Sequence, residues 1–264
     1  MSALETTAAG PVLVRQDGPE ARITLNRPKQ RNALSVEVME EVTAAVRRLG
    51  TDPSVRAIVI EGAGPAFCSG HDLGEMVGRD VAFYQHVFDV CTEMTEAVHR
   101  VPQPVIARVH GIATAAGCQL VAACDLAVAV EEARFGTPGV KIGLFCSTPM
   151  VPLSRAVGRK RALEMLLTGT PIDAATALEW GLVNRVVPAD ALDDAVAELV
   201  DAIARSSSLT VAIGKEAFYK QIELDEPRAY DLTKTVMAMN MLAADAQEGI
   251  CAFLEKREPT WTGR

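Results

Sequence analysis

Residues 55–73 read VRAIVIEGAGPAFCSGHDL and decide the fold. The first six form a short, largely β-branched run, which predicts a strand buried on both faces of a sheet. The Gly/Pro-rich stretch that follows predicts a loop over 61–70. The same order recurs at 104–120, PVIARVHGIATAAGCQL, where we expect a strand up to Val109 and a helix of small residues after Gly111. Strands that alternate with helices in this way indicate an α/β core with parallel strands.

Further elements are predicted on both sides of these stretches. Ser35 stands where an N-cap is expected, before a helix that runs to about Leu49 and is ended by Gly50. Across residues 192–203 apolar side chains recur at intervals of three and four, which predicts an amphipathic helix. The other predicted elements are strands at 12–16, 21–25, 126–130 and 183–187 and a helix at 83–100.

The chain divides softly near residue 190, where helical spacing takes over. We expect residues 1–190 to form the α/β core and residues 191–264 to form a helical region. The stretch 237–242 within that region is unusually rich in methionine. Since methionine fills irregular apolar contacts, we expect this stretch to be buried in the core or in a subunit contact.

Composition places the chain among globular proteins. Of its 264 residues, 49% are hydrophobic and 23% are charged. The net charge of -8 argues against general nucleic-acid binding. The longest uncharged apolar stretch, residues 111–124, is too short to span a bilayer. We therefore expect neither a nucleic-acid partner nor a membrane span.

The cysteines and the amino terminus bear on the location of the protein. None of the six cysteines forms a CxxC pair, which is typical of reduced thiols in a cytosolic protein. The amino terminus has no basic region followed by an apolar run, so no secretory signal is expected. The four histidines lack HExxH spacing, so no metal site is expected either. The sequence thus predicts a cytoplasmic protein.

Two loops of small residues, at 66–73 and 110–120, each lie between a strand and a helix. Ligands of α/β folds gather at such places. Amides at a helix start can face a developing negative charge, and small side chains let a ligand approach the backbone. Two such loops could supply two amides to one oxygen, which is an oxyanion hole. The alternative is that Ala and Gly here serve only tight packing of helix on sheet.

The chain resembles the enoyl-CoA hydratase/isomerase, or crotonase, superfamily over nearly its whole length. The matching segments are Ile23-Thr24-Leu25-Asn26-Arg27-Pro28 with Asn32-Ala33-Leu34, Ala66 to Leu73, Ala115 to Leu120 with Cys124-Asp125, and Phe135-Gly136-Thr137-Pro138. The resemblance implies a crotonase-like spiral of ββα units and a C-terminal helical trimerisation region. It also implies homotrimers or dimers of trimers, and an acyl-CoA thioester ligand in which coenzyme A is part of the substrate. No other cofactor is implied.

The resemblance also assigns site residues. The two oxyanion amides fall on the backbone N–H groups of His71 and Ala116, and the two catalytic glutamates of the family fall on Gln119 and Gly139. A basic cluster of Arg27, Lys29 and Arg31 falls where the family meets the nucleotide phosphates, with an ordinary solvated loop as the alternative. Lys256 and Arg257 are further candidates that could reach a ligand from a neighbouring helix or subunit. The expected substrate-binding residues are Arg27, Lys29, Ala66, Ser69, Gly70, Asp72, Leu73, Gly117, Cys146 and Lys256.

Glutamine and glycine at the glutamate positions put conventional hydration in doubt. Loss of acid–base help costs about 10²–10⁴-fold per group. The chain is similar in this respect to the enoyl-CoA hydratase domain-containing type, which lacks both glutamates. Cys146 and the His71 side chain are the nearest alternative reactive groups; if they have no chemical role, they are packing residues. Gln119 would position a water or hold the acyl chain. Asp72 would brace its loop.

Three functions stay open at this point. The first is an enzyme of lipid metabolism that stabilises a thioester enolate without the usual glutamates. The second is a non-catalytic acyl-CoA-binding or regulatory protein. The third is a structural partner subunit of a lipid-metabolism assembly.

Overall fold

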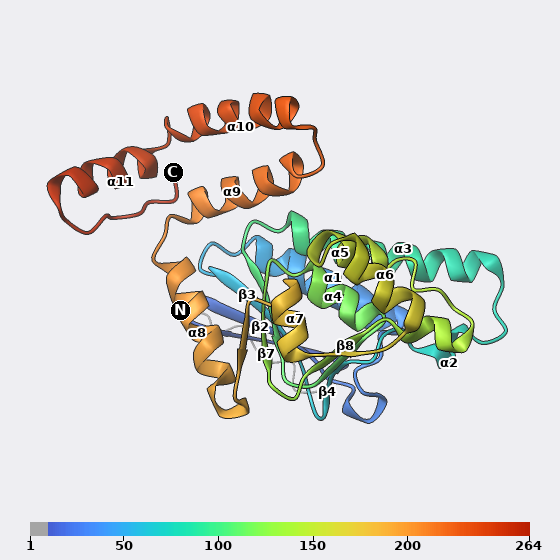
Figure 1. The fold of residues 1–264 in the computed structure, drawn as a ribbon. Coiled ribbons are helices and arrows are strands. Elements are labelled where there is room, and N and C mark those ends of the chain that lie inside the picture. The colour runs from blue at the N-terminus through green and yellow to red at the C-terminus, as the bar shows by residue number, and fades with distance from the viewer. Residues whose placement is uncertain (1–9) are drawn as a thin grey trace.

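Two sheets organise the computed structural model, which describes residues 10–264 (Figure 1). The amino terminus, where no secretory signal is expected, lies mostly in residues 1–9, outside the described residues. The larger sheet has six strands in the order β1-β2-β3-β5-β7-β10, and the smaller has four in the order β4-β6-β8-β9. The strands are β1 (Val12–Asp17), β2 (Glu20–Leu25), β3 (Ala57–Gly62), β4 (Ala66–Cys68), β5 (Val105–Val109), β6 (Ile112–Thr114), β7 (Leu126–Val130), β8 (Arg134–Gly136), β9 (Ile172–Asp173) and β10 (Arg185–Val187).

The chain winds through both sheets in repeated turns. Each turn contributes one strand to the large sheet, then one strand to the small sheet, and then a helix. In the first turn β3 and β4 precede α2 (Leu73–Met76) and α3 (Val81–Arg100). In the second turn β5 and β6 precede α4 (Ala116–Ala123). The third turn gives β7 and β8 before a 3-10 turn and α5 (Met150–Ala156). Neighbouring strands of successive turns are parallel. This arrangement confirms the predicted spiral of ββα units.

The strands of the large sheet lie close to their predicted positions, whereas none of the four strands of the small sheet was predicted. The shortest of them, β9, has two residues. The prediction of a loop through 61–70 is wrong because β4 lies within it, and β6 and β8 were likewise missed. Each of these strands has only three residues. Three residues are too few to show the alternation of apolar and polar side chains by which a strand is recognised.

The core includes buried residues of both sheets and of the helices that cover them, α1 (Val36–Gly50) and α3 among them. All four residues of β3 from Ala57 to Ile60 are buried, as the β-branched run predicts. The hydroxyl of Ser35 accepts a hydrogen bond from the amide of Val38, which makes it the predicted N-cap of α1.

The helix α4 packs directly against the small sheet. A β-carbon on Gly117, in the first turn of α4, would lie 2.3 Å from the carbonyl oxygen of Cys68 at the end of β4. Only glycine allows this approach. The close packing fixes the amino end of α4 over the carboxyl ends of β4 and β6.

The helical last third separates into one helix on the sheet and an arm. Helix α8 (Leu192–Ala204) lies against the large sheet, where Asp193 pairs with Arg22 and Arg108 at 2.8 and 2.9 Å. The helices α9 (Ser208–Gln221), α10 (Glu226–Asn240) and α11 (Ala244–Glu255) extend away from the sheets as an arm (Figure 1). The remaining helices are α6 (Arg159–Thr168) and α7 (Ala174–Trp180).

A buried ion pair attaches the arm to the core. Lys215 of α9 donates to Asp125 at 2.6 Å and to the carbonyl oxygens of Val98 and Gln103, both at 2.8 Å. The other carboxylate oxygen of Asp125 accepts from the Tyr219 hydroxyl at 2.7 Å. Burial lowers the pKa of Lys215, and the nearby Asp125 carboxylate opposes that change. The ammonium group is thus fully hydrogen-bonded where α9 crosses the core.

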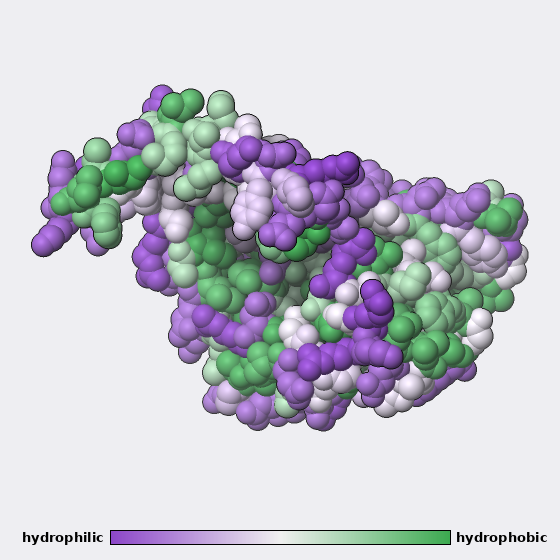
Figure 2. Space-filling model, turned by 45° about the horizontal axis from the view of Figure 1, so that its top comes forward, coloured by the Kyte–Doolittle hydropathy of each residue, from purple (hydrophilic) through white to green (hydrophobic). Residues whose placement is uncertain are grey.

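The Met-rich stretch is not part of the core of this chain, so that half of the expectation is wrong. Met237 and Met239 are 62% and 63% exposed, and Leu242 is 76% exposed. They lie on the arm, whose surface carries hydrophobic side chains (Figure 2). The stretch lies mostly in α10, as the helical spacing expected beyond residue 190 predicts, but its composition alone does not say which surface covers it.

Removing the arm's charged anchor should weaken the protein. For Lys215→Met we expect the free energy of unfolding in urea to fall by about 3–5 kcal/mol, because Asp125 would lose its buried cation. Lys220→Met on the same helix, where the lysine side chain is 60% exposed, should change it by less than about 0.5 kcal/mol. Equal effects of the two substitutions would contradict the anchoring role.

Glycine should be required for packing at position 117 but not at position 214. Gly117→Ala should cost about 1–3 kcal/mol, because the added methyl group meets the backbone of Cys68. Gly214→Ala, in α9 with open space around its α-carbon, should stabilise the chain by about 0.5–1 kcal/mol. Thermal or urea unfolding of both variants measures the difference, and a stable Gly117→Ala variant would refute the packing argument.

Candidate active site

The site is built around the first residues of α4. Ala115 precedes the helix with φ 51°, a conformation that favours glycine. Its amide donates to the carbonyl oxygen of Gly136 at 2.9 Å, which ties the turn to β8. Ala116 begins the helix, so its amide has no partner within α4.

The residues after β4 lie directly against this turn. A β-carbon on Gly70 would lie 2.8 Å from that of Ala115 and 3.3 Å from the amide nitrogen of Ala116. Gly70 has φ +96°. The segment is held by Leu34, whose amide donates to the Gly70 carbonyl at 2.8 Å and whose carbonyl accepts from the Asp72 amide at 2.9 Å. The structure therefore brings the two loops predicted from sequence side by side.

The amides of His71 and Ala116 both remain available. In the pairing with Leu34, the hydrogen bonds use the residues on either side of His71 and bypass its own amide. Among the described residues, neither nitrogen has a hydrogen-bond acceptor. Two unpaired N–H groups in adjacent loops are the groups that can stabilise a developing oxyanion.

Gln119 lies one turn into α4 and is only 3% exposed. Its Nε2 donates to the Thr95 hydroxyl of α3 at 3.0 Å, and that hydroxyl donates to the carbonyl oxygen of Cys91 at 2.9 Å. The Oε1 of Gln119 is buried and has no hydrogen-bond partner among the described residues. Burial raises the pKa of the Cys91 thiol to about 12, although the neighbouring Gln119 opposes the change.

The half-buried His71 side chain lies in the same region, with both ring nitrogens buried. Its ring meets Phe88 of α3 edge to face, with centroids 5.6 Å apart, and neither ring nitrogen has a partner among the described residues. Burial lowers the pKa of His71 below its ordinary value. The imidazole is therefore neutral at neutral pH, with one donor and one acceptor.

No space exists for a side chain at position 139. A β-carbon on Gly139 would lie 2.5 Å from the carbonyl oxygen of Leu144 and 2.8 Å from Sγ of Cys146. Burial raises the pKa of the Cys146 thiol, which keeps it protonated and weakly nucleophilic. Cys146 thus fills the space beside Gly139. The contact leaves no sign in the sequence, because it depends on how the 139–146 loop turns back on itself.

An ion pair stabilises the loop that carries Asp72. Asp72 accepts from Gly74 at 3.1 Å, which caps α2, and pairs with Arg27 at 3.0 Å. Arg27 also donates to the carbonyl oxygen of Ala33 at 2.9 Å. Lys29 is exposed and has no ion pair among residues 10–264. Of the basic residues predicted to meet phosphate, Arg27 is already engaged by protein groups.

Asn32 is a residue whose role the sequence did not reveal. It is 1% exposed, and its Nδ2 donates to the carbonyl oxygens of Ala63, Ala66 and Phe67. Its Oδ1 accepts from the Arg27 amide at 2.9 Å. One side-chain amide thus joins the basic loop to the backbone of β4. Polar residues in loops give no sign of such a hub before the fold is known.

The other predicted binding residues fall at different distances from this centre. Ala66 lies buried in β4, Ser69 donates through Oγ to the carbonyl oxygen of Gln30 at 3.4 Å, and Leu73 begins α2 and is exposed. Lys256 ends α11 at the far end of the arm, apart from α4 within one chain (Figure 1). Within one chain the structure does not bring it to the site.

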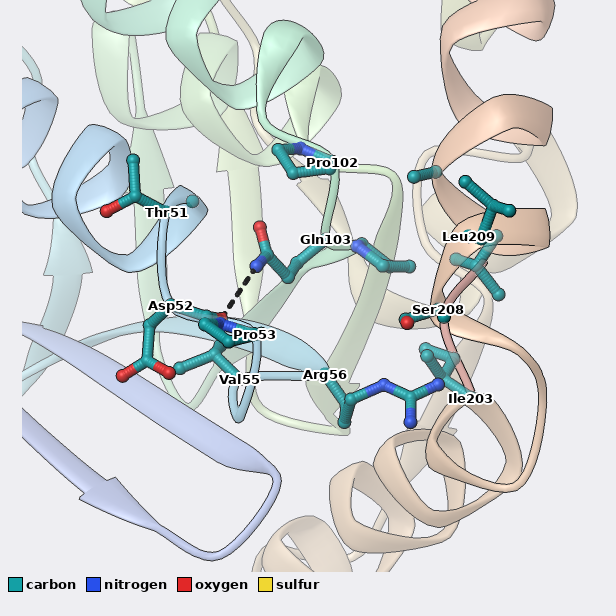
Figure 3. A pocket seen from close by; sticks show the side chains of 15 residues that line it. Thr51, Asp52, Pro53, Val55, Arg56, Pro102, Gln103, Ile203, Ser208 and Leu209 are labelled. Atoms are coloured by element: carbon teal, nitrogen blue, oxygen red, sulfur yellow. Dashed lines mark hydrogen bonds between the residues drawn. The ribbon is translucent and has the colours of Figure 1, made fainter. Parts of the chain in front are cut away.

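A separate cavity of about 250 Å³ lies elsewhere (Figure 3). Its lining includes Gly50 at the end of α1, Arg56 before β3, Gln103 before β5 and Ser208 at the start of α9. It therefore opens at the amino ends of the parallel strands, opposite the ends where α/β ligands gather. Arg56 and Gln103 are engaged with backbone carbonyl oxygens there, which favours a role in joining the arm to the core.

Among residues 10–264, no helix is both long and apolar enough to cross a bilayer. In the same range, no three His, Cys, Asp or Glu side chains gather closely enough to hold a metal ion.

Comparison with known proteins gives consistent matches over nearly the whole chain. Residues 19–264 match the family model for enoyl-CoA hydratase/isomerase. The mitochondrial enoyl-CoA hydratase domain-containing protein 3 of Xenopus laevis is 46% identical over 253 residues, which cover 95% of this chain and 85% of the relative. The human protein of the same name is 46% identical over 255 residues, 96% of this chain and 84% of the relative.

Solved structures agree with the sequence matches. The crystal structure of an enoyl-CoA hydratase from Mycobacterium smegmatis superposes with a TM-score of 0.94 at 50% identity, covering 96% of this chain and 99% of that one. The human domain-containing protein 3 superposes with a TM-score of 0.92 at 45% identity, covering 96% and 100%.

The names of these relatives correct the expected location, and the comparisons together establish the family. The Xenopus and human relatives are named as mitochondrial, which contradicts the expected cytoplasmic location. Unpaired cysteines indicate a reducing environment and do not distinguish one reducing compartment from another. On the family itself, model, relatives and structures agree, so the chain belongs to the enoyl-CoA hydratase/isomerase, or crotonase, family.

Proposed function

We propose that this protein binds an acyl-CoA thioester and polarises its carbonyl group with the amides of His71 and Ala116. The observation that carries the proposal is the contact of Gly70 with the Ala115–Ala116 turn, which places two unpaired amides in adjacent loops. Negative charge grows on a thioester oxygen as an enolate forms, and one well-placed amide is worth about 2.7–4 kcal/mol in such a site. The family match and the names of the relatives support the ligand class.

The basic loop supports recognition of the coenzyme A phosphates. Lys29 and Arg31 are exposed beside the Arg27–Asp72 pair that braces the site. Because Arg27 is already paired, we assign it to positioning the loop and assign the phosphate contacts to Lys29 and Arg31. A local basic group of this kind offsets the net charge of -8 where an anionic ligand approaches.

We further propose that conventional hydration of 2-enoyl thioesters is weak or absent. Gln119 has an amide where the family has a carboxylate, and an amide cannot accept a proton at neutral pH. Gly139 has no side chain, and Cys146 with the Leu144 carbonyl fills the space where one would extend. Two missing acid–base groups predict a large loss of hydration rate.

The packing at Gly139 also favours a second candidate, a non-catalytic acyl-CoA-binding or regulatory subunit. Such a site keeps both amides, but its glutamate positions hold a glutamine and a space filled by other groups. It could therefore bind a thioester without converting it. Both candidates predict binding of a thioester, and only the first predicts turnover.

Binding of a thioester tests the shared proposal. Butyryl-CoA, which has no double bond to hydrate, should bind with micromolar affinity in calorimetry. Ala116→Pro should weaken that binding about tenfold, because it removes one N–H at a helix position that tolerates proline. Ala116→Gly keeps the N–H and should bind nearly as the original chain does.

Hydration of crotonyl-CoA separates this proposal from an ordinary hydratase. We expect a kcat/KM at least 10²-fold below the diffusion-limited range. A rate within about tenfold of that range would show that Gln119 and Gly139 do not limit the chemistry. Failure of the chain to bind any coenzyme A thioester would remove the proposed function altogether.

We propose that the helical region beyond residue 190 mediates assembly into homotrimers or dimers of trimers, through the arm of α9, α10 and α11. The exposed apolar side chains of the arm support this: Phe218, Ile222, Tyr230, Met237, Met239, Leu242, Phe253 and Leu254. Hydrophobic side chains are visible on this part of the surface (Figure 2). Exposed apolar patches of this kind mark interaction sites.

The oligomeric state is measured directly by light scattering after gel filtration. We expect the mass of three or six chains. Phe253→Asp, at a residue that is 82% exposed, should shift the distribution towards single chains. Val77→Asp changes a residue of similar exposure on the core and serves as the control. A single-chain mass for the unaltered protein would contradict the assembly.

A further inference from the structure

Asn32 closes the basic loop, residues 27–31, on itself. Its Oδ1 accepts from the Arg27 amide, and its own amide donates to the Arg27 carbonyl oxygen, both at 2.9 Å. Arg31 and Asn32 have φ 52° and 56°, in the left-handed region that residues other than glycine rarely adopt. Two such residues in succession persist only where the surrounding structure holds them. The hydrogen bonds of Asn32 supply that constraint.

The same side chain fixes the basic loop to the strand β4, which leads to His71. The Nδ2 of Asn32 lies 2.9, 2.7 and 3.2 Å from the carbonyl oxygens of Ala63, Ala66 and Phe67. Because Nδ2 faces three acceptors and Oδ1 faces a donor, the side-chain amide has only one satisfactory orientation. The loop and the strand are therefore joined through a single group.

The residues around Asn32 also hold the His71 amide in place. The carbonyl oxygen of Arg31 accepts from the Ser69 amide at 3.0 Å. Leu34 is hydrogen-bonded to the residues on either side of His71, as a parallel bridge. Asn32 lies between these two contacts along the chain. One continuous stretch of backbone thus sets the positions of the basic side chains and of the His71 amide.

Asn32 itself is not available to a ligand. It is 1% exposed, and both polar atoms of its side chain are engaged with backbone groups. The groups that would contact a ligand are the exposed Lys29 and Arg31 at one end and the His71 amide at the other. An effect of Asn32 on binding must therefore act through the position of these groups.

We propose that Asn32 is a positioning residue that holds the basic loop and the His71 amide as one preformed unit, so that neither end of a coenzyme A thioester has to order its own part of the site. The inference rests on the proposed function, which assigns the phosphates to Lys29 and Arg31. When only a fraction of a protein is competent to bind, the apparent affinity falls by that fraction for every ligand of the ordered state. Loss of the Asn32 side chain should therefore weaken both ends of the ligand together.

Three probes separate the two ends of the ligand. Adenosine 3′,5′-bisphosphate has phosphates and no thioester, S-butyryl-pantetheine has a thioester and no phosphate, and butyryl-CoA has both. Asn32→Gly removes the side chain at a residue whose φ suits glycine. In calorimetry on the full chain, we expect this variant to bind each probe about tenfold more weakly. Butyryl-CoA should lose the same factor once and not twice, because one ordering step serves both ends.

The two fragments together give a readout that a merely structural role would not change. In the unaltered chain, saturating adenosine 3′,5′-bisphosphate should leave the affinity for S-butyryl-pantetheine the same within about twofold, because the unit is already formed. In Asn32→Gly, the nucleotide should order the loop and restore most of the lost affinity for the thioester fragment. The first measurement needs no variant, so it tests the proposal even where Asn32→Gly does not fold.

Gln103→Ala is the matched control. Gln103 is also a buried side-chain amide whose nitrogen donates to backbone carbonyl oxygens of another segment, those of Leu49 and Asp52, and it lies at the separate cavity (Figure 3). Its loss should lower the stability to urea, because a buried hydrogen-bonded group is removed. The affinities for all three probes should stay unchanged.

The outcomes separate this proposal from the proposed function. Strong cooperativity between the two fragments in the unaltered chain overturns the role of Asn32. Unchanged binding by Asn32→Gly, a loss confined to one fragment, or an equal loss in Gln103→Ala overturns it as well. In each of these cases butyryl-CoA still binds the unaltered chain, so the proposed function stands. Binding of no coenzyme A thioester by the unaltered chain overturns both proposals.

Discussion

The whole site depends on the close approach of two backbone segments, the residues that end and follow β4 and the first turn of α4. Gly117 lies against the Cys68 carbonyl, and Gly70 lies against Ala115. These contacts join the small sheet to the first turn of α4, and no side chain fits between the two. Once the backbones are this close, the amides of His71 and Ala116 come from adjacent loops without any further element to hold them. Gly70 and Gly117 thus position the amides of two other residues, His71 and Ala116.

Around that contact, the polar residues divide the work of holding the loops. Asn32 fixes the basic loop to β4 through three carbonyl oxygens, and Arg27 fixes the same loop to Asp72. Both interactions are saturated within the protein. Of the buried polar atoms without a partner among the described residues, four belong to His71, Gln119 and Thr137. The residues that hold the loops are thus engaged within the protein, whereas part of the unused capacity for hydrogen bonding lies where a ligand is proposed to bind.

Much of this could be predicted from the sequence, and what could not has physical reasons. The buried β-branched run at β3 and the Ser35 cap of α1 each depend on local pattern, and both are found where expected. The three-residue strands of the small sheet exist only because other turns of the spiral pair with them, so no local pattern marks them. Likewise, the contact of Cys146 with Gly139 and the Thr95–Gln119 bond join residues that are brought together by folding.

The conformation of Ala115 has a consequence for ligand affinity. In the unfolded chain an alanine has fewer accessible conformations than a glycine, so ordering it costs less entropy. In the folded chain Ala115 has φ 51°, and its methyl group lies against Gly70. The conformational cost of the turn is therefore met during folding and not during binding. A thioester that arrives at this turn would find its amide donor already immobile, so none of its interaction energy would be diverted to ordering the loop.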